Sequence, residues 1–273
     1  MVILVTGANG QLGQALKSIE SIYPEHKFIF CDSAQLDVTI PQSIADEFLK
    51  HKPDYCINAA AYTAVDAAES DRDKAYLINV TGAKNLSQLC EVHGVVLLHL
   101  STDFVFDGVK TSDDCLGYVE EDVPNPINYY GWTKWKGEQE IVQNLKSHYI
   151  IRTSWVYSDY GSNFYKTMLH LAKTHTSLKV VSDQIGCPTH AVDLAKKLLC
   201  VIDHDTSNFG IYHITGDVVC SWYDFAKSIF STNGIDIDVQ AIPSVSYPTP
   251  AIRPLYSVLS NKKFKEQFDC LNR

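Results

Sequence analysis

A glycine-rich loop between an apolar run and a helical pattern constrains the fold of this chain more than any other feature. Residues 2–6 are apolar and predict a buried strand, and apolar residues recur at the spacing of a helix face from residue 11 to 21. Between them stands Gly7-Ala8-Asn9-Gly10-Gln11-Leu12-Gly13, a G-x-x-G-x-x-G loop. Here the first glycine permits a tight turn, the second lets the backbone approach a pyrophosphate, and the third packs helix on strand. Because a helix start presents unpaired N–H groups to anions, the loop predicts dinucleotide binding; a glycine-rich turn without a ligand is the alternative.

The same alternation of strand and helix continues along the chain. Apolar runs at 27–31, 54–58, 95–100 and 148–152 are separated by helical patterns at 40–51, 74–93 and 130–145, and His99 is the polar exception in its run. Strands without polar alternation are covered on both faces, which indicates a parallel sheet with right-handed crossovers. We therefore predict an α/β fold, a Rossmann-like doubly wound parallel sheet with a smaller C-terminal substrate lobe. Residues 1–153 would form the dinucleotide-binding domain, and residues 154–273 the lobe, partly interleaved with the sheet.

Charge and cysteine usage exclude several classes of protein. The chain carries 23 basic and 32 acidic residues, a net charge of −9, and its richest basic pair is Lys262-Lys263. Nucleic-acid binding needs clustered cations, so no nucleic-acid partner is expected. No apolar run approaches the roughly 20 residues that span a bilayer, and the N-terminus lacks a basic signal region, so we expect a cytoplasmic protein without a membrane partner. Eight scattered cysteines without a C-x-x-C pair predict reduced thiols and no metal site.

Asp32 follows the second predicted strand, about 20 residues beyond the loop, where a carboxylate binds the adenosine ribose. Such a carboxylate accepts hydrogen bonds from both ribose hydroxyls and repels a 2′-phosphate. No arginine stands beside it, which favours NADH over NADPH. A surface turn residue is the alternative.

Two further motifs carry polar chemistry. Tyr130 and Lys134 form a Tyr-x-x-x-Lys unit on a predicted helix, where residues four apart share one face. A cation one turn away favours the phenolate and predicts a lowered tyrosine pKa. The run Ser101-Thr102-Asp103 ends the fourth predicted strand, at the edge of the sheet where ligands bind. Alone, these motifs are also compatible with a surface pair and a helix cap. Their order behind the glycine loop favours an active site.

At this point the chain resembles the extended short-chain dehydrogenase/reductase superfamily, and within it the dTDP-4-dehydrorhamnose reductases. The segments that carry the resemblance span nearly the whole length: Leu36-Asp37-Val38-Thr39, residues 58–66, Ser101-Thr102-Asp103-Phe104-Val105-Phe106-Asp107-Gly108, Arg152-Thr153-Ser154-Trp155-Val156-Tyr157, Asp183-Gln184-Ile185-Gly186-Cys187-Pro188-Thr189, Tyr247-Pro248-Thr249-Pro250 and Arg253-Pro254.

The resemblance implies reduction of the C4 keto group of dTDP-4-dehydro-L-rhamnose to dTDP-L-rhamnose by NADPH or NADH. It implies that Tyr130 donates the proton, that Lys134 lowers the tyrosine pKa and holds the nicotinamide ribose, and that Thr102 bonds the sugar carbonyl. The cofactor residues would be Gly7, Gly10, Gln11, Leu12, Gly13, Asp32, Asp37, Val38, Ala61, Tyr62, Thr63, Tyr130 and Lys134. Asp103 and Trp155 would contact the substrate beside Thr102. Arg253, the single cation of a proline-rich segment, is a candidate for the sugar-nucleotide pyrophosphate.

The chain departs from the family pattern at several positions. Phe104 stands where a tyrosine is usual, and the Arg-Pro-x-Asn-Ser pattern reads Arg253-Pro254-Leu255-Tyr256-Ser257. Some members dimerise through magnesium held by glutamates, where this chain has Gln14-Ala15 and His190-Ala191. The usual C-terminal helix is also expected to be missing. These departures predict a monomer or weak homodimer, without the magnesium-bridged interface.

Two other functions fit parts of the pattern. The first is a nucleotide-sugar epimerase or dehydratase, but the Asp-Glu pair typical of a dehydratase is replaced by Asp103-Phe104 after Thr102. The second is a non-catalytic NAD(P)-binding regulatory subunit resembling that of methionine adenosyltransferase. The complete set of Thr102, Tyr130 and Lys134 favours an oxidoreductase over both.

Overall fold

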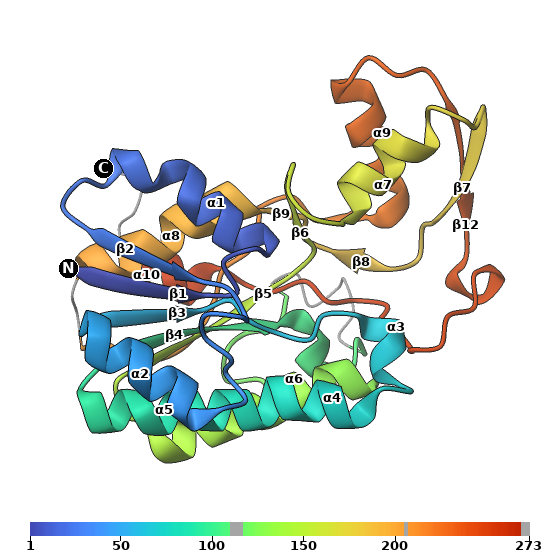
Figure 1. Cartoon of the computed structure of the whole chain (residues 1–273). Coiled ribbons are helices and arrows are strands. Elements are labelled where there is room, and N and C mark those ends of the chain that lie inside the picture. Colours follow the sequence, from blue (N-terminus) through green and yellow to red (C-terminus); the bar gives the residue numbers. More distant parts are fainter. Residues whose placement is uncertain (110–116, 205–206, 269–273) are drawn as a thin grey trace.

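The computed structural model describes residues 1–109, 117–204 and 207–268. Six parallel strands form the main sheet in the order β10-β5-β4-β3-β1-β2 (Figure 1). Their bounds are β1 (Val2–Thr6), β2 (Lys27–Cys31), β3 (Tyr55–Asn58), β4 (Val96–Thr102), β5 (His148–Thr153) and β10 (Gly210–His213). The predicted doubly wound α/β fold is confirmed.

The direction in which successive strands are added to the sheet reverses at β1. Leu4 of β1 pairs with Ile29 of β2 on one side and Cys56 of β3 on the other, so the chain crosses outward from β1 to β2 and then returns past β1 to β3. A crevice opens at such a switch point, beyond the carboxyl ends of the strands. The glycine loop after β1 and the segment after β3 therefore border the same opening.

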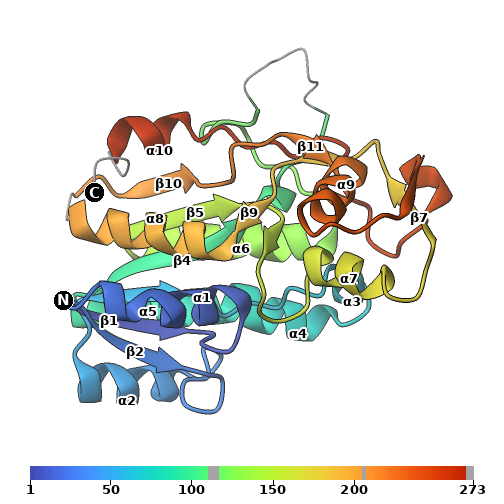
Figure 2. The same ribbon diagram turned by 90° about the horizontal axis from the view of Figure 1, so that it is seen from above.

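Helices cover both faces of this sheet, as a strand apolar on both sides requires (Figures 1 and 2). One face carries α1 (Gln11–Ile19) and α8 (Ala191–His204), with α10 (Lys262–Gln267) beside β10. The other face carries α2 (Pro41–His51), α5 (Gly82–His93) and α6 (Tyr129–Asn144). Two separate apolar clusters, one for each face, fill these layers.

The continuous helix predicted over 74–93 is wrong in one respect, because a π-helical turn interrupts it. The segment divides into α4 (Arg72–Tyr76), the π turn η2 (Leu77–Thr81) and α5, after the short α3 (Val65–Ala68). The side chain of Asn79 leaves this turn to bond the backbone N–H and carbonyl of Tyr62 and the hydroxyl of Thr133. The turn therefore joins the loop after β3 to α6.

A smaller lobe stands at the carboxyl edge of the sheet (Figure 1). It contains α7 (Phe164–Leu171), α9 (Trp222–Thr232) and the parallel pair β7 (Ser177–Val181) and β12 (Asp238–Ile242), which share their own apolar cluster. Between these elements the chain returns to the main sheet as α8 and β10. The division after residue 153 stays a prediction. The remaining short elements are η1 (Glu20–Ile22), η3 (Asp103–Val105), β6 (Val156–Tyr157), β8 (Ile185–Gly186), β9 (Thr189–His190), β11 (Cys220–Ser221) and η5 (Ser244–Ser246).

Cysteine chemistry differs from expectation at one position. Cys31, Cys56, Cys90, Cys187 and Cys220 are free thiols, and four of them are buried. Cys200, in contrast, is disulfide-bonded, so the expectation that every cysteine is reduced is wrong there. In the part of the chain that the structure describes, no helix combines the length and apolar character needed to span a membrane.

Candidate active site

The glycine loop has the geometry that its pattern predicts. Gly7 adopts a left-handed φ of +65°, and a Cβ there would lie 2.7 Å from the Ala59 backbone. A Cβ on Gly13 would lie 2.6 Å from the Gly7 carbonyl oxygen, so this glycine brings α1 against the loop. Gly10 has only one neighbouring atom within 4 Å of such a Cβ, at 3.3 Å. The backbone at Gly10 is therefore open to a ligand, at a helix start without a side-chain cap or an acidic first turn.

A cavity of about 530 Å³ lies on one side of the loop, between the ends of β1, β2 and β3. Gly7, Gly10, Asp32, Asp37, Val38 and Ala61 line it. The carboxylate of Asp32 accepts hydrogen bonds from the backbone N–H groups of Ala34 and Gln35 and from Asn9 Nδ2, at 3.0–3.2 Å. Asp32 is therefore held at the mouth of this cavity, where Lys74 is the one cation among the lining residues.

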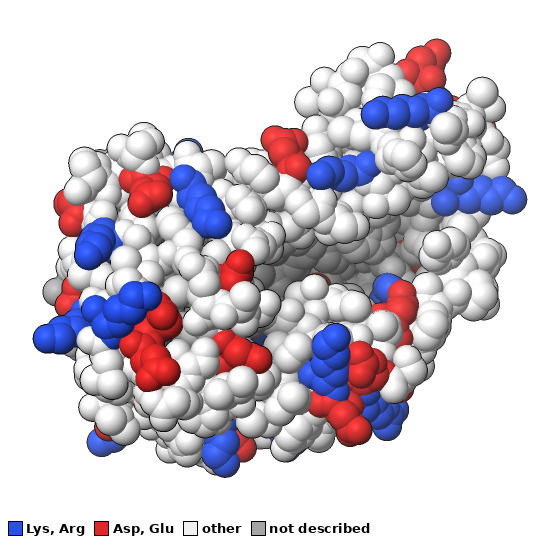
Figure 3. Space-filling view, in the orientation of Figure 1, with Lys and Arg blue, Asp and Glu red and all other residues white. Residues whose placement is uncertain are grey.

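A second cavity of about 520 Å³ continues from Gly10 and Ala61 into the hollow between the sheet and the lobe (Figure 3). It brings together ten of the predicted site residues from five segments of the chain. They are Gly10, Gln11, Leu12, Ala61, Thr63, Thr102, Asp103, Tyr130, Lys134 and Trp155.

Tyr130 is placed by the close approach of α6 to the end of β4. A Cβ on Gly131 would overlap the carbonyl oxygen of Phe104, so only glycine allows this contact. Asn128 caps the helix by accepting a hydrogen bond of 2.8 Å from the Gly131 N–H. The Tyr130 ring then packs edge-on against Phe104, with centroids 5.9 Å apart. A glycine in the second position of the motif thus sets the height of the tyrosine above the sheet.

The hydroxyl of Tyr130 hydrogen-bonds with Thr102. Burial raises the pKa of Tyr130 to about 12, and the negative charge of Asp103 adds to this, while the Thr102 bond opposes it. The net shift is opposite to the lowered tyrosine pKa that the Tyr-x-x-x-Lys spacing predicts, because desolvation dominates. Tyr130 therefore keeps its proton near neutral pH, as a proton donor must.

Asp103 lines the same cavity as Tyr130, and its carboxyl group is buried. Asp103 is 2% exposed. Its Oδ1 accepts a hydrogen bond from the Thr102 hydroxyl at 3.0 Å, and its Oδ2 has no hydrogen-bond partner. Burial raises its pKa from 3.8 to about 7, against the opposing hydrogen bonds from Ser257 and Thr102. The carboxyl group is thus protonated in part near neutral pH.

Lys134 follows Tyr130 by one turn of α6 and is 2% exposed. Its Nζ donates to the Leu100 carbonyl at 2.6 Å and lies 3.3 Å from Nε2 of His99. Burial lowers the pKa of Lys134 to about 8, and the charge of Glu138 opposes this shift. The amino group is therefore anchored near the carboxyl end of β4, and Lys134 lines the same cavity as Tyr130.

A buried ion pair lies one turn further along α6. Arg152 of β5 donates to Glu138 from Nε at 3.0 Å and from Nη2 at 2.7 Å, and Ser101 of β4 donates to the same carboxylate. Both charged residues are 2% exposed. The pair fastens α6 to two neighbouring strands directly below the site.

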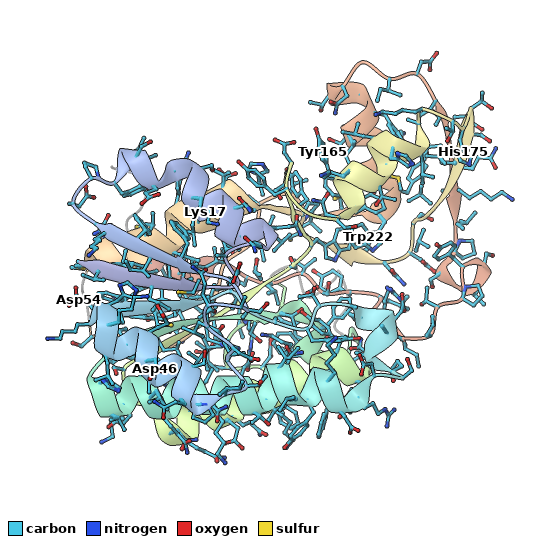
Figure 4. The ribbon with its side chains drawn as sticks, viewed as in Figure 1. Lys17, Asp46, Asp54, Tyr165, His175 and Trp222 are labelled. Carbon is cyan, nitrogen blue, oxygen red and sulfur yellow. The ribbon has the colours of Figure 1, made fainter. Side chains whose placement is uncertain are left out.

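Trp155 forms the wall toward the lobe. It has a left-handed φ of +47°, and its ring stacks on Trp222 with centroids 3.4 Å apart and planes 6° from parallel. Trp222 begins α9 at the base of the lobe (Figure 4). The stack therefore connects the end of β5 to the lobe across the hollow.

Three predicted site residues lie outside both cavities. Gly13 packs α1 on the loop, and the backbone of Tyr62 is engaged by Asn79. Arg253 forms an ion pair of 2.8 Å with Asp66 of α3 and also donates to Thr249. Its guanidinium charge is thus compensated within the protein.

Sequence reasoning missed several residues that shape the site: Asn58, Asn79, Glu138, Arg152 and Trp222. Asn58 and Arg152 stand in segments that carry the family resemblance, but nothing there marked them as site residues. His99, the polar member of an apolar strand, gave a further signal. Among the described residues, one group of possible metal ligands, Glu25, His26 and Asp203, comes together, and it lines neither cavity.

The family model, the sequence relatives and the most similar of the solved structures described below all belong to one group of reductases. The family described as RmlD substrate binding domain matches residues 1–273. The dTDP-4-dehydrorhamnose reductase of Aggregatibacter actinomycetemcomitans is 39% identical, over 97% of this chain and 92% of its own length. The dTDP-4-keto-6-deoxy-D-glucose reductase of Streptomyces niveus is 36% identical, over 96% of this chain and 90% of its own length.

Solved structures extend the comparison to three dimensions. A dTDP-4-dehydrorhamnose reductase from Bacillus anthracis in complex with NADP has a TM-score of 0.92 and 38% identity, covering 97% of this chain and 92% of its own. A dTDP-4-dehydrorhamnose reductase from Clostridium acetobutylicum has a TM-score of 0.90 and 42% identity, covering 99% of both chains. The UDP-glucose 4-epimerase of Thermus thermophilus, at 19% identity and a TM-score of 0.80, shows the shared fold alone.

Proposed function

Since this chain belongs to the RmlD substrate binding domain family, we propose that it reduces the C4 keto group of dTDP-4-dehydro-L-rhamnose to dTDP-L-rhamnose with NADPH or NADH. The observation that carries the proposal is the convergence of Thr102, Tyr130 and Lys134 in one cavity that is continuous with the glycine loop. A binding module without turnover would not need a proton donor and a buried lysine at that place.

The dinucleotide fits the two cavities on the evidence of the loop itself. The open backbone at Gly10 and the uncapped start of α1 suit a pyrophosphate, with Gln11 and Leu12 in the same turn. Asp32 would accept from the adenosine ribose, and Asp37 and Val38 would line the adenine. Tyr130 and Lys134 would hold the nicotinamide ribose, and the segment Ala61-Tyr62-Thr63, of which Ala61 and Thr63 line the same cavity, would contact the dinucleotide. When bound, the reduced nicotinamide supplies the hydride.

The chain itself supplies the proton. Thr102 and Tyr130 would both bond the C4 oxygen, and the Tyr130 hydroxyl would donate its proton as the alkoxide forms. A phenol of raised pKa holds its proton until that moment, and the adjacent Lys134 ammonium then stabilises the phenolate. Positioned acids of this kind contribute about 10²–10⁴-fold to the rate.

The substrate would lie toward the lobe. Asp103 and Trp155 line the far side of the cavity and would contact the sugar. Arg253 remains our candidate for the pyrophosphate, and binding would require it to share or exchange its bond with Asp66. If Arg253→Ala left KM for the sugar nucleotide unchanged, this assignment would be withdrawn.

The test is oxidation of NADH, and separately NADPH, on addition of enzymatically generated dTDP-4-dehydro-L-rhamnose. Loss of reduced cofactor that disappears in Tyr130→Phe supports the proposal, and the two rates give the cofactor preference. The substrate of the Streptomyces relative, a dTDP-4-keto-6-deoxy-D-glucose, is the second sugar to test. Cofactor binding without oxidation on either sugar would contradict the reductase function.

We also propose a cytoplasmic monomer or weak homodimer without a bridging metal, since the reaction draws on the cellular pool of reduced dinucleotide. Gln14-Ala15 and His190-Ala191 offer no carboxylate for magnesium. Sedimentation with and without a chelator should give one and the same mass.

A further inference from the structure

A buried chain of hydrogen bonds crosses the switch point of the sheet and ends on Lys134. Thr6 of β1 donates to Asn58 Oδ1 of β3 at 2.6 Å, Asn58 Nδ2 lies 2.9 Å from Nδ1 of His99 in β4, and His99 Nε2 lies 3.3 Å from Lys134 Nζ. All four residues are at most 3% exposed. The chain begins directly before the glycine loop and ends on Lys134, one helical turn from Tyr130.

The hydrogen bonds of Asn58 decide which nitrogen of His99 carries the proton. Asn58 Oδ1 already accepts from the Thr6 hydroxyl and from the backbone N–H of Ala60, so its Nδ2 is the group that faces His99. An amide N–H can only donate, and Nδ1 of His99 must therefore accept. A neutral imidazole has one N–H, which then lies on Nε2 and points at Lys134.

We propose that His99 is a positioning residue for the reduction: its Nε2–H, oriented by Asn58 and Thr6, lies against the Lys134 amino group and limits the pH range in which that group stays protonated. The inference rests on the proposed function of Lys134. It assigns to a strand histidine an influence on the protonation of Lys134, while the Leu100 carbonyl anchors the same nitrogen.

The protonation of both groups follows from this geometry. Burial lowers the pKa of His99 well below 6.5, and Lys134 and His148 add to the shift, so the imidazole is neutral. An N–H directed at Nζ is favourable for an amine with a lone pair and unfavourable for an ammonium ion. His99 therefore acts in the same direction as burial, which lowers the pKa of Lys134 to about 8.

The other charged groups around Lys134 belong to the elements packed against it. Glu138 on α6 favours the ammonium ion, and Arg152 on β5 compensates Glu138. Tyr130 and Asp103 both line the cavity that Lys134 lines. None of these supplies the directed N–H of His99, which is why a single substitution can isolate its effect.

The first experiment needs no substrate. In uniformly nitrogen-15-labelled protein, the imidazole shifts of His99 should report a neutral ring protonated at Nε2 across neutral pH. A ring protonated at Nδ1, or at both nitrogens, would overturn the proposal. This result does not depend on which sugar the enzyme reduces, so it stands apart from the test of the function.

The second experiment is the pH profile of kcat in His99→Leu. A net hydrogen bond of about 1 kcal/mol corresponds to somewhat less than one pH unit, so the basic limb should move upward by about that amount. His99→Gln, which can place an amide N–H near Nζ, should restore much of the original profile. His148→Leu removes a neighbouring buried histidine whose ring bonds the Leu145 carbonyl, and its profile should not move. An unmoved or downward-shifted limb in His99→Leu would refute the role.

Discussion

Replacing Glu138 by alanine would leave the guanidinium of Arg152 buried without its partner. The side chains of the two residues are 2–3% exposed, and the substitution removes both hydrogen bonds from Arg152 and the one from Ser101. What remains near the guanidinium is the Phe106 ring, 5.2 Å away, while Nη1 has no hydrogen-bond partner even in the intact pair. The expected outcome is therefore a large loss of stability.

Breaking one half of a buried ion pair costs about 3–5 kcal/mol, because the other charge stays desolvated. A protein is typically stable by about 5–15 kcal/mol, so this single change would consume a substantial share. Urea unfolding followed by far-ultraviolet circular dichroism measures the difference. The paired replacement Glu138→Leu with Arg152→Met should recover most of the loss, since it removes both charges at similar volume.

The matched control is an exposed pair. Glu266 lies 3.8 Å from Lys262 on α10, and both side chains are more than half exposed, so Glu266→Ala should cost less than about 1 kcal/mol. The reasoning fails if Glu138→Ala costs no more than this control, or if the paired replacement is less stable than Glu138→Ala.

Three further outcomes are expected. Gly131→Ala should lower kcat at least tenfold and lower Tm, because the added Cβ would push α6 and Tyr130 away from Phe104. Gly94 has open space around it, so Gly94→Ala should lower the unfolding free energy by about 1 kcal/mol and leave kcat unchanged. Asp103 binds its proton more tightly in the folded state, so the unfolding free energy should fall by about 1.4 kcal/mol per pH unit between about pH 4 and pH 7. Asp103→Asn should flatten that slope. An equal slope in both proteins would contradict the raised pKa of Asp103. Trp222→Ala should lower Tm and raise KM for the sugar nucleotide, because the Trp222 ring stacks on Trp155. The Kd for the cofactor should stay the same, since Trp222 lines neither cavity. Weaker cofactor binding would show that this account of the lobe is wrong.

The sheet and its helices could be predicted from the sequence because their signals are local. An apolar strand followed by a glycine loop determines its own conformation, and the helix predicted over 130–145 matches α6 to within a residue at each end. The π turn at 77–81 could not be predicted, because it forms to let Asn79 bond Tyr62 and Thr133, both distant in sequence.

The sequence predicted which residues line the cavity better than it predicted their pKa values. The spacing of Tyr130 and Lys134 shows that a cation is near the phenol, but the pKa of Tyr130 depends on how deeply α6 sits against Phe104, which no local pattern records. Glu138 and Arg152 illustrate the same limit, since each is an ordinary charged residue in its own segment. Their meeting is a property of the order of the strands.

The side chain of Gln11 belongs to the glycine loop and to the approach to the lobe at once. It accepts from Ser158 at 3.0 Å and from Asn163 at 2.7 Å, and it donates to the Val156 carbonyl at 3.3 Å, so the first residue of α1 secures the segment that leads from β5 into α7. A dinucleotide that immobilises this turn therefore also steadies the wall against which the sugar is received. Coupling of this kind is reciprocal, so whatever the cofactor contributes to the affinity for the sugar, the sugar returns to the cofactor.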